Sequence, residues 1–132
     1  LGVTLGLENH WGLTTRAETM LKILRRVSSR YFGVIMDTGN FLYDTYNELE
    51  AIAPYTVMVH AKTYFGGGVW YTLDIDYDRV FTILRNAGFK GWVSLEYEGR
   101  EDYSTGIKKS RDLLLKYVKS PLSLLHGSSV DG

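Results

Sequence analysis

Four short runs of β-branched and other apolar residues alternate along the chain with longer segments of helical periodicity. The runs occupy residues 3–7, 33–36, 56–59 and 92–97. A short apolar run is typical of a buried strand, and apolar residues three or four apart are typical of a helix that covers it. Because strand and helix alternate four times, the sequence predicts an α/β fold of βα units around a parallel sheet.

The predicted helices carry start and stop signals. Thr15 and Glu18 read as a capping box at the start of the first helix, and Pro54 ends the second. Asp76 is the expected N-cap of the third helix, and the fourth is expected from 104 or 105 to 118. The residues expected on the inward faces of the four helices are Met20, Leu21, Leu24 and Val27, then Leu42, Tyr46, Leu49 and Ala53, then Val80, Phe81, Leu84 and Ala87, and last Ile107, Leu114 and Val118.

Composition narrows the class of protein. The chain has 132 residues, and its 15 Lys and Arg balance its 15 Asp and Glu, which argues against the basic surface that nucleic-acid binding requires. No apolar run approaches the ~20 residues of a membrane span. Without cysteine, a thiolate metal site and a cysteine nucleophile are excluded. The first residues lack the pattern of a signal peptide, so we expect a cytoplasmic protein that binds neither nucleic acid nor membrane.

A side chain that can bind a metal ion stands at the carboxyl end of each predicted strand. These residues are Glu8, Asp37, His60 and Glu96. Each has the strand parity that points toward the inner face of the sheet, while the apolar residues between them point toward the helices. Three carboxylates and one imidazole suit Mn²⁺, Mg²⁺ or Co²⁺ better than a structural zinc ion. The pattern therefore predicts one shared site at the carboxyl ends of the strands.

The segments around these residues resemble the xylose isomerase-like TIM-barrel superfamily, which includes sugar phosphate isomerases and ketose 3-epimerases. The matching segments are Leu-Glu-Asn-His at 7–10, Asp-Thr-Gly-Asn at 37–40, Val-His-Ala-Lys at 59–62 and Leu-Glu-Tyr-Glu at 95–98. The resemblance implies that residues 1–119 are the carboxyl-terminal half of a (β/α)8 barrel, with strands equivalent to the fifth to eighth. Residues 120–132 are expected to be a partly disordered tail.

The resemblance also implies roles for the four strand-end residues. Glu8, Asp37, His60 and Glu96 would bind one divalent metal ion, and Glu8 and Glu96 would also be the acid/base pair. One glutamate would remove a proton from the sugar and the other would return it, through an enediolate. The same residues would support a dehydratase of a polyol or keto-acid. A third alternative is an inactive half-barrel that retains only the fold and the metal site.

One departure from the superfamily pattern concerns histidines. Many members have a histidine three residues after the aspartate ligand, where this chain has Asn40. The related apurinic endonucleases build a trinuclear zinc site from several histidines, and this chain has only His10, His60 and His126. Together with the zero net charge, this argues against a role in DNA repair.

Substrate contacts are expected from residues close to the strand ends. The candidates are His10, Trp11, Asn40 and Lys62, with Tyr64 and Trp70 as further rings that could stack on a sugar. Glu98 has the parity of Glu96, and it is either a partner for a nearby Lys or Arg or a catalytic group. The glycine-rich stretch 62–75 is either a lid or a flexible connector.

Half of a barrel leaves two strand edges without a partner and an inner face without cover. We therefore expect that two copies associate, or that a missing amino-terminal half completes the barrel. The chain begins at Leu1 directly on a strand-like run, which fits a start at the fifth strand. The expected small-molecule partner is a carbohydrate.

Overall fold

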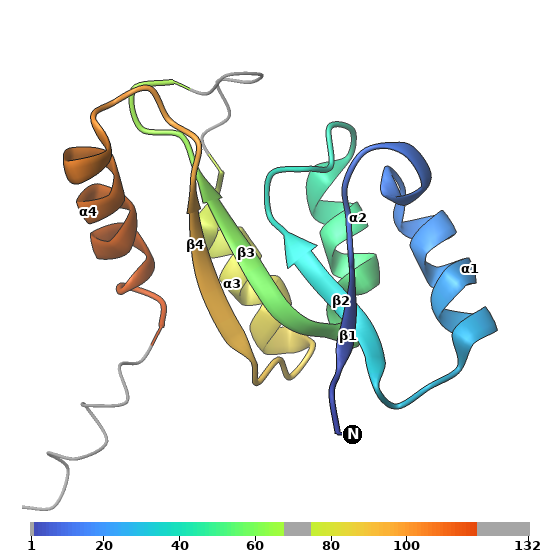
Figure 1. The fold of residues 1–132 in the computed structure, drawn as a ribbon. Helices are drawn as coiled ribbons and strands as arrows, with labels where there is room; N and C mark the ends of the chain where they lie inside the picture. The colour runs from blue at the N-terminus through green and yellow to red at the C-terminus, as the bar shows by residue number, and fades with distance from the viewer. Residues whose placement is uncertain (1, 68–74, 119–132) are drawn as a thin grey trace, which may run out of the picture.

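The four strands of this computed structural model form one parallel sheet in chain order (Figure 1). The structure describes residues 2–67 and 75–118. The strands are β1 (Leu5–Glu8), β2 (Phe32–Asp37), β3 (Thr56–Thr63) and β4 (Trp92–Tyr97). A helix follows each strand, so the predicted α/β class is confirmed, and the arrangement is that of half a (β/α)8 barrel.

The helices cover one face of the sheet. Figure 1 shows α2 and α3 behind the sheet, α1 beside β1 and β2, and α4 beside β4. Helix α3 begins at its predicted N-cap, Asp76. The side chain of Asp76 accepts a hydrogen bond of 3.0 Å from the N–H of Arg79. The helices are α1 (Ala17–Val27), α2 (Thr45–Ile52), α3 (Tyr77–Asn86) and α4 (Tyr103–Leu114), with 3-10 turns η1 (Gly12–Thr14) and η2 (Ala53–Tyr55).

The apolar core lies between the sheet and the helices. Val34 and Met36 of β2 and Val59 of β3 are fully buried. Their positions in the strands were predicted to face the helices. They belong to the same buried cluster as Met20 of α1 and Leu49 of α2. Because these alternate residues point toward the helices, the residues between them point toward the inner face of the sheet.

The register of the strands shifts the polar residues progressively toward the carboxyl end of the sheet from β1 to β4. Glu8 pairs with Ile35, so Asp37 lies two residues further along its strand. Asp37 pairs with His60 across β2 and β3, and Glu96 pairs with Lys62, two residues beyond His60. Such a stagger is what the tilted strands of a closed barrel require. It carries the inner-face residues toward one end of the sheet.

The predicted capping box at the start of α1 is wrong. Thr15 donates its hydroxyl to the carbonyl oxygen of Gly12, and Glu18 pairs with Lys22 one turn further along the helix. The N-cap of α1 is Arg16, which makes no capping hydrogen bond with its side chain. Instead the buried carboxylate of Glu48, from α2, accepts the N–H of Ala17 and pairs with Arg16. A neighbouring helix therefore caps α1.

Of the three residues predicted on the inward face of α4, Leu114 is buried and Val118 packs against the core, but the prediction for Ile107 is wrong. Ile107 is 46% exposed, and the buried residues of the helix are Gly106, Ser110 and Leu114. The helix approaches β4 so closely that a Cβ atom at Gly106 would collide with the ring of Tyr97. Small residues thus form this contact, and a search for large apolar side chains does not detect them.

Two further expectations about the helices are wrong. Leu42 lies outside α2 and is 45% exposed, because the chain turns through Asp44 (φ +53°) before the helix begins at Thr45. Val27, in the last turn of α1, is half exposed.

Strand β3 runs four residues beyond the predicted end at 59, so Lys62 belongs to the sheet and not to the loop after it.

Two predicted segments, the glycine-rich stretch at 62–75 and the tail, extend beyond the described residues. Residues 68–74, with Trp70, and the predicted tail at 120–132 lie outside the described residues. Whether 62–75 forms a lid therefore stays a prediction. None of the helices within residues 2–67 and 75–118 is long and apolar enough to cross a membrane.

Candidate metal centre at the strand ends

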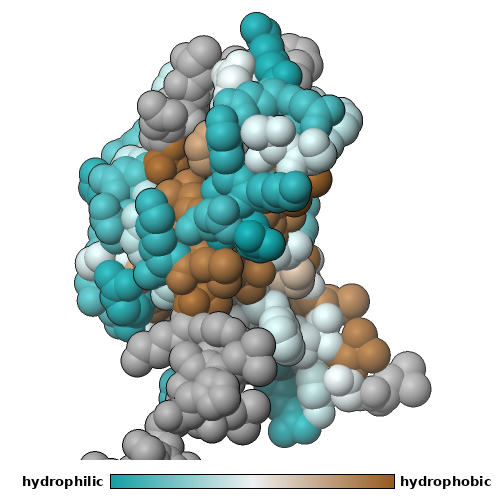
Figure 2. Space-filling model, turned by 90° about the vertical axis from the view of Figure 1, so that its left-hand side faces the viewer, coloured by the Kyte–Doolittle hydropathy of each residue, from teal (hydrophilic) through white to brown (hydrophobic). Residues whose placement is uncertain are grey.

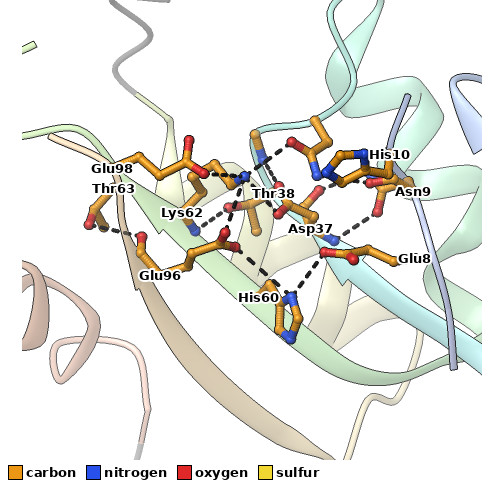
Figure 3. A network of polar contacts seen from close by, with 12 residues as sticks. Glu8, Asn9, His10, Asp37, Thr38, His60, Lys62, Thr63, Glu96 and Glu98 are labelled. Carbon is orange, nitrogen blue, oxygen red and sulfur yellow. Dashed lines mark hydrogen bonds and ion pairs between the residues drawn. The ribbon is translucent and has the colours of Figure 1, made fainter. Parts of the chain in front are cut away.

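The structure brings the four strand-end residues together on the inner face of the sheet (Figure 3). Glu8, Asp37, His60 and Glu96 each offer one ligand atom, and these four atoms lie within 4.8 Å of one another. Asp37 is fully buried, and the other three side chains are partly exposed. The cluster combines three carboxylates and one imidazole on four different strands, as the strand parity predicts.

His60 lies between the two glutamates of the cluster. Its Nδ1 atom is 3.0 Å from Oε1 of Glu8 and 3.9 Å from Oε2 of Glu96. Figure 3 shows the two carboxylates directed toward the same ring nitrogen, one from β1 and one from β4. The first and last strands of the sheet therefore both contribute to the site through the histidine of β3.

Two buried carboxylate oxygens of the cluster make no regular hydrogen bond, although one of them belongs to an ion pair. Among the described residues, Oδ2 of Asp37 and Oε2 of Glu96 have no hydrogen-bond partner. Oδ1 of Asp37, in contrast, accepts the N–H of Gly39 at 2.8 Å. Oδ2 of Asp37 already faces the Lys62 ammonium group at 3.1 Å, whereas no donor or cation in the described part of the chain lies as close to Oε2 of Glu96. An unsatisfied buried acceptor costs about 1–3 kcal/mol, and a bound cation would remove this cost at Glu96. Because hard divalent cations prefer carboxylate oxygens, the residues present fit such an ion.

Lys62 brings a positive charge into the same network. Its side chain is 4% exposed, and its Nζ atom is 3.1 Å from Oδ2 of Asp37 and 3.4 Å from Oε1 of Glu96. The same nitrogen donates to Oδ1 of Asn40 and Oε1 of Glu98, each at 3.1 Å. Of the two alternatives for Glu98, the structure thus shows the ion pair with a neighbouring lysine.

Burial and charge shift the pKa values of this buried pair. Burial raises the pKa of Asp37 to about 7, because loss of hydration outweighs the opposing charge of Lys62. Burial alone would lower the pKa of Lys62, but the carboxylates of Asp37, Glu98 and Glu96 raise it to about 12. The ammonium group therefore stays charged at neutral pH.

Asn9 fixes the position of Asp37, a role that the sequence pattern did not predict. Its side chain exchanges two hydrogen bonds with the backbone of Asp37: Nδ2 donates to the carbonyl oxygen at 2.8 Å, and Oδ1 accepts the N–H at 2.7 Å. Asn40 donates to the backbone carbonyl of Asn9 at 3.0 Å. The Asn9 amide thereby continues the hydrogen bonding between the two chain segments beyond the end of β1. The available signal was a polar residue directly after a strand, adjacent to Glu8.

Thr38 and Tyr77 hold the backbone at Lys62, and they too were not predicted. Oγ1 of Thr38 accepts the N–H of Lys62 at 2.9 Å and lies 3.0 Å from the hydroxyl of Tyr77. The Tyr77 hydroxyl donates to the carbonyl oxygen of Lys62 at 2.6 Å. These contacts connect α3 and the end of β2 to the middle of the site.

The predicted substrate contacts divide into two groups. Asn40 and Lys62 are buried within the polar network. His10 and Trp11 lie in the loop after β1, both are exposed, and their ring centroids are 5.1 Å apart. Tyr64 is partly buried, and a Cβ atom at Gly39 would lie 2.7 Å from its hydroxyl. The first group is therefore beside the cluster of Glu8, Asp37, His60 and Glu96, and His10 and Trp11 are open to solvent.

Solved structures of ketose 3-epimerases share this fold. The L-ribulose 3-epimerase structure matches 99% of this chain and 53% of its own, with a TM-score of 0.72 and 18% identity. The D-tagatose 3-epimerase-like protein matches 94% of this chain and 48% of its own (TM-score 0.65, 20% identity). D-allulose 3-epimerase from Methylomonas sp. matches 89% and 49% (TM-score 0.70, 14% identity). This chain thus spans about half the length of these proteins.

Comparisons of sequence point to the same fold family. No curated protein matches the chain at a significant level. The sequence profile described as xylose isomerase-like TIM barrel matches residues 1–117, which is most of the chain. With four βα units in barrel order, this match shows that the chain belongs to the xylose isomerase-like TIM barrel family.

Proposed function

We propose that the chain carries the metal centre and the acid/base pair of a divalent-metal-dependent sugar or sugar phosphate isomerase or epimerase. The observation that carries this proposal is the pair of carboxylates, Glu8 from β1 and Glu96 from β4, that both face Nδ1 of His60 within one four-ligand cluster. The names of the similar solved structures favour epimerisation of a ketose at carbon 3.

Four side chains would hold the cation in this proposal: Glu8, Asp37, His60 and Glu96. Mn²⁺, Mg²⁺ and Co²⁺ suit this donor set, because three of its four donors are carboxylates. A cation bound there supplies polarisation of the substrate carbonyl and the adjacent hydroxyl, which makes the neighbouring C–H group more acidic.

The two glutamates move the proton in this proposal. One carboxylate removes the proton from the carbon beside the carbonyl, so the C–H bond breaks, its electron pair forms the enediolate, and the carboxylate becomes a carboxylic acid. The second carboxyl group delivers a proton to the opposite face of the same carbon, which gives the epimer, or to the neighbouring carbon, which gives the isomer. Glu8 and Glu96 suit this two-sided transfer because they belong to β1 and β4, with His60 between them.

The reaction type is testable by NMR of ketoses incubated with the chain and Mn²⁺ in D₂O. We expect a new epimer with one solvent deuterium at carbon 3 and an unchanged formula, dependent on the ion and abolished by a chelator. Loss of water from the substrate would instead identify a dehydratase. A failure to exchange any carbon-bound proton of ketoses or their phosphates, in a completed barrel shown to bind Mn²⁺, would contradict the proposal.

We also propose that further chain completes the barrel, either from a second copy or from an amino-terminal half. Within the described sheet, β1 and β4 each have a strand partner on one side only. Trp92, on the inner face of β4, is 80% exposed, and Leu5 of β1 is 65% exposed. Figure 2, which views the molecule from the side of α4, shows apolar surface in the middle of that face. These features suit burial against another protein segment.

Light scattering of this chain tests the second-copy alternative. If two copies complete each other, the scattering mass at micromolar concentration should be about twice the 15.0 kDa of one chain. Replacement of Trp92 by lysine should shift the mass toward that of the monomer, whereas Tyr43→Lys, at an exposed loop position, should not. A monodisperse monomer would exclude the dimer and leave only an amino-terminal half to complete the barrel.

A further inference from the structure

The Lys62 ammonium group lies inside a set of four oxygen atoms next to the candidate metal site (Figure 3). Three of these atoms are 3.1 Å from Nζ: Oδ2 of Asp37, Oδ1 of Asn40 and Oε1 of Glu98. The fourth, Oε1 of Glu96, is 3.4 Å away. Two of the four residues, Asp37 and Glu96, also belong to the candidate metal site. The ammonium group and a metal ion would therefore share two carboxylates.

The oxygen set around Lys62 is itself of the kind that binds cations. Three carboxylates and one amide oxygen are ligands that hard divalent ions accept. An ammonium group has three N–H donors, and the three oxygens at 3.1 Å match that number. The position beside the metal site is thus occupied by a cation that belongs to the protein.

The lysine is held in this position by its surroundings. The Lys62 side chain is almost completely buried, and a Cβ atom at Gly39 would lie only 2.9 Å from its Cδ atom. The backbone of Lys62 is bonded on both sides, by Thr38 at its N–H and by Tyr77 at its carbonyl oxygen. The ammonium group therefore cannot leave the oxygen set without disrupting packed structure.

The charges of the network are consistent with one ion and one ammonium group. Four carboxylates face this region, from Glu8, Asp37, Glu96 and Glu98, and Lys62 is the cation in contact with three of them. With the lysine and a divalent ion both in place, the carboxylates retain one uncompensated negative charge. Without the lysine, the same carboxylates would be neutralised by two divalent ions.

We propose that Lys62 fills a second cation position, so that the centre takes one divalent metal ion and not two. This inference rests on the proposed metal centre. It assigns Lys62 a role in the number of ions bound and in their affinity, separate from any contact with a substrate. Lys62 is then a positioning residue for the metal site.

Two substitutions test the proposal by different properties of the lysine. Lys62→Ala removes both the charge and the volume, so it opens the position to an ion. Lys62→Met removes the charge but keeps most of the volume, so it leaves no room for an ion. Lys109→Ala is the matched control, because Lys109 pairs with Glu101 on the exposed side of α4.

The measurements are ion counting by native mass spectrometry and titration calorimetry with Mn²⁺ on the 132-residue chain. We expect one ion in the original chain and in Lys109→Ala, two ions in Lys62→Ala, and one ion in Lys62→Met. Because a fixed positive charge beside the ion repels it, the dissociation constant of that ion in Lys62→Met should fall about tenfold or more. If Lys62→Ala does not fold, the affinity of Lys62→Met still tests the proposal.

Two results would overturn the proposal. One is a single ion in folded Lys62→Ala, and the other is an unchanged dissociation constant in Lys62→Met. If the original chain binds one ion that is lost in His60→Ala, either result removes the role of Lys62 alone. If neither the original chain nor the Lys62 variants bind Mn²⁺, the proposed metal centre fails as well.

Discussion

Replacement of Glu8 or Glu96 by glutamine should lower kcat for sugar epimerisation about 10³-fold or more while the chain stays folded. Glutamine keeps the size of the side chain but cannot accept a proton from carbon at neutral pH, and general acid–base catalysis contributes about 10²–10⁴-fold. Both carboxylates are partly exposed, so the loss of charge costs little packing. The measurement is kcat at saturating Mn²⁺, with the bound metal counted separately for each variant.

The matched control for these two variants is Glu50→Gln, at an exposed position of α2. It should leave both kcat and metal content unchanged. Circular dichroism of all three variants should show the helix content of the original chain. Activity that persists at the original level in both Glu8→Gln and Glu96→Gln, with metal bound, would exclude the two glutamates as the acid/base pair.

Replacement of Asp37 by asparagine should abolish stabilisation by metal and also weaken the metal-free fold. The Asp37 side chain is fully buried, with Gly39 N–H 2.8 Å from one oxygen and Lys62 Nζ 3.1 Å from the other. The amide nitrogen of asparagine would place a donor against one of these two donors. Lys62 keeps its contacts with Glu96 and Glu98, so the cost is that of the mismatched buried donor, about 1–3 kcal/mol of the free energy of unfolding in urea.

The metal affinity of Asp37→Asn should decrease at least about 100-fold, because loss of a group that merely supports a metal ligand already costs about 10–100-fold. The readout is the rise in Tm on addition of Mn²⁺, which should disappear. Asp112→Asn is the control, since Asp112 pairs with Arg111 on the exposed side of α4 and should not alter either property. An Asp37→Asn chain that gains as much Tm from Mn²⁺ as the original would show that Asp37 is not a ligand.

Strand parity explains why the cluster of Glu8, Asp37, His60 and Glu96 was predictable from sequence. Side chains alternate between the two faces along β2, so the burial of Val34 and Met36 against the helices places Asp37, the last residue of the strand, on the inner face. The same alternation places His60 on the face opposite Val59. The carboxyl ends of parallel strands lie at one edge of the sheet. The proximity of these residues is therefore predictable even when the loops and helices are unknown.

Features that depend on two distant segments were not predictable in the same way. Glu48 caps α1 from a different helix, and no local pattern around Thr15 contains that information. Gly106 and Ser110 form the buried side of α4 because Tyr97 occupies the space between helix and strand. The arrangement around Lys62 likewise needs the pairing of β3 with β4, which extends the strand past its apolar run.

The register between β2 and β3 has a consequence for the resistance of the chain to proteolysis. A slip of one residue would turn His60 toward the helices while Asp37 stayed on the inner face, so only the correctly paired sheet can assemble the cluster. An ion that binds this cluster stabilises that pairing alone, by about 2.7 kcal/mol when its concentration is a hundred times its dissociation constant. The resistance of the chain to proteolysis should then follow the supply of that ion.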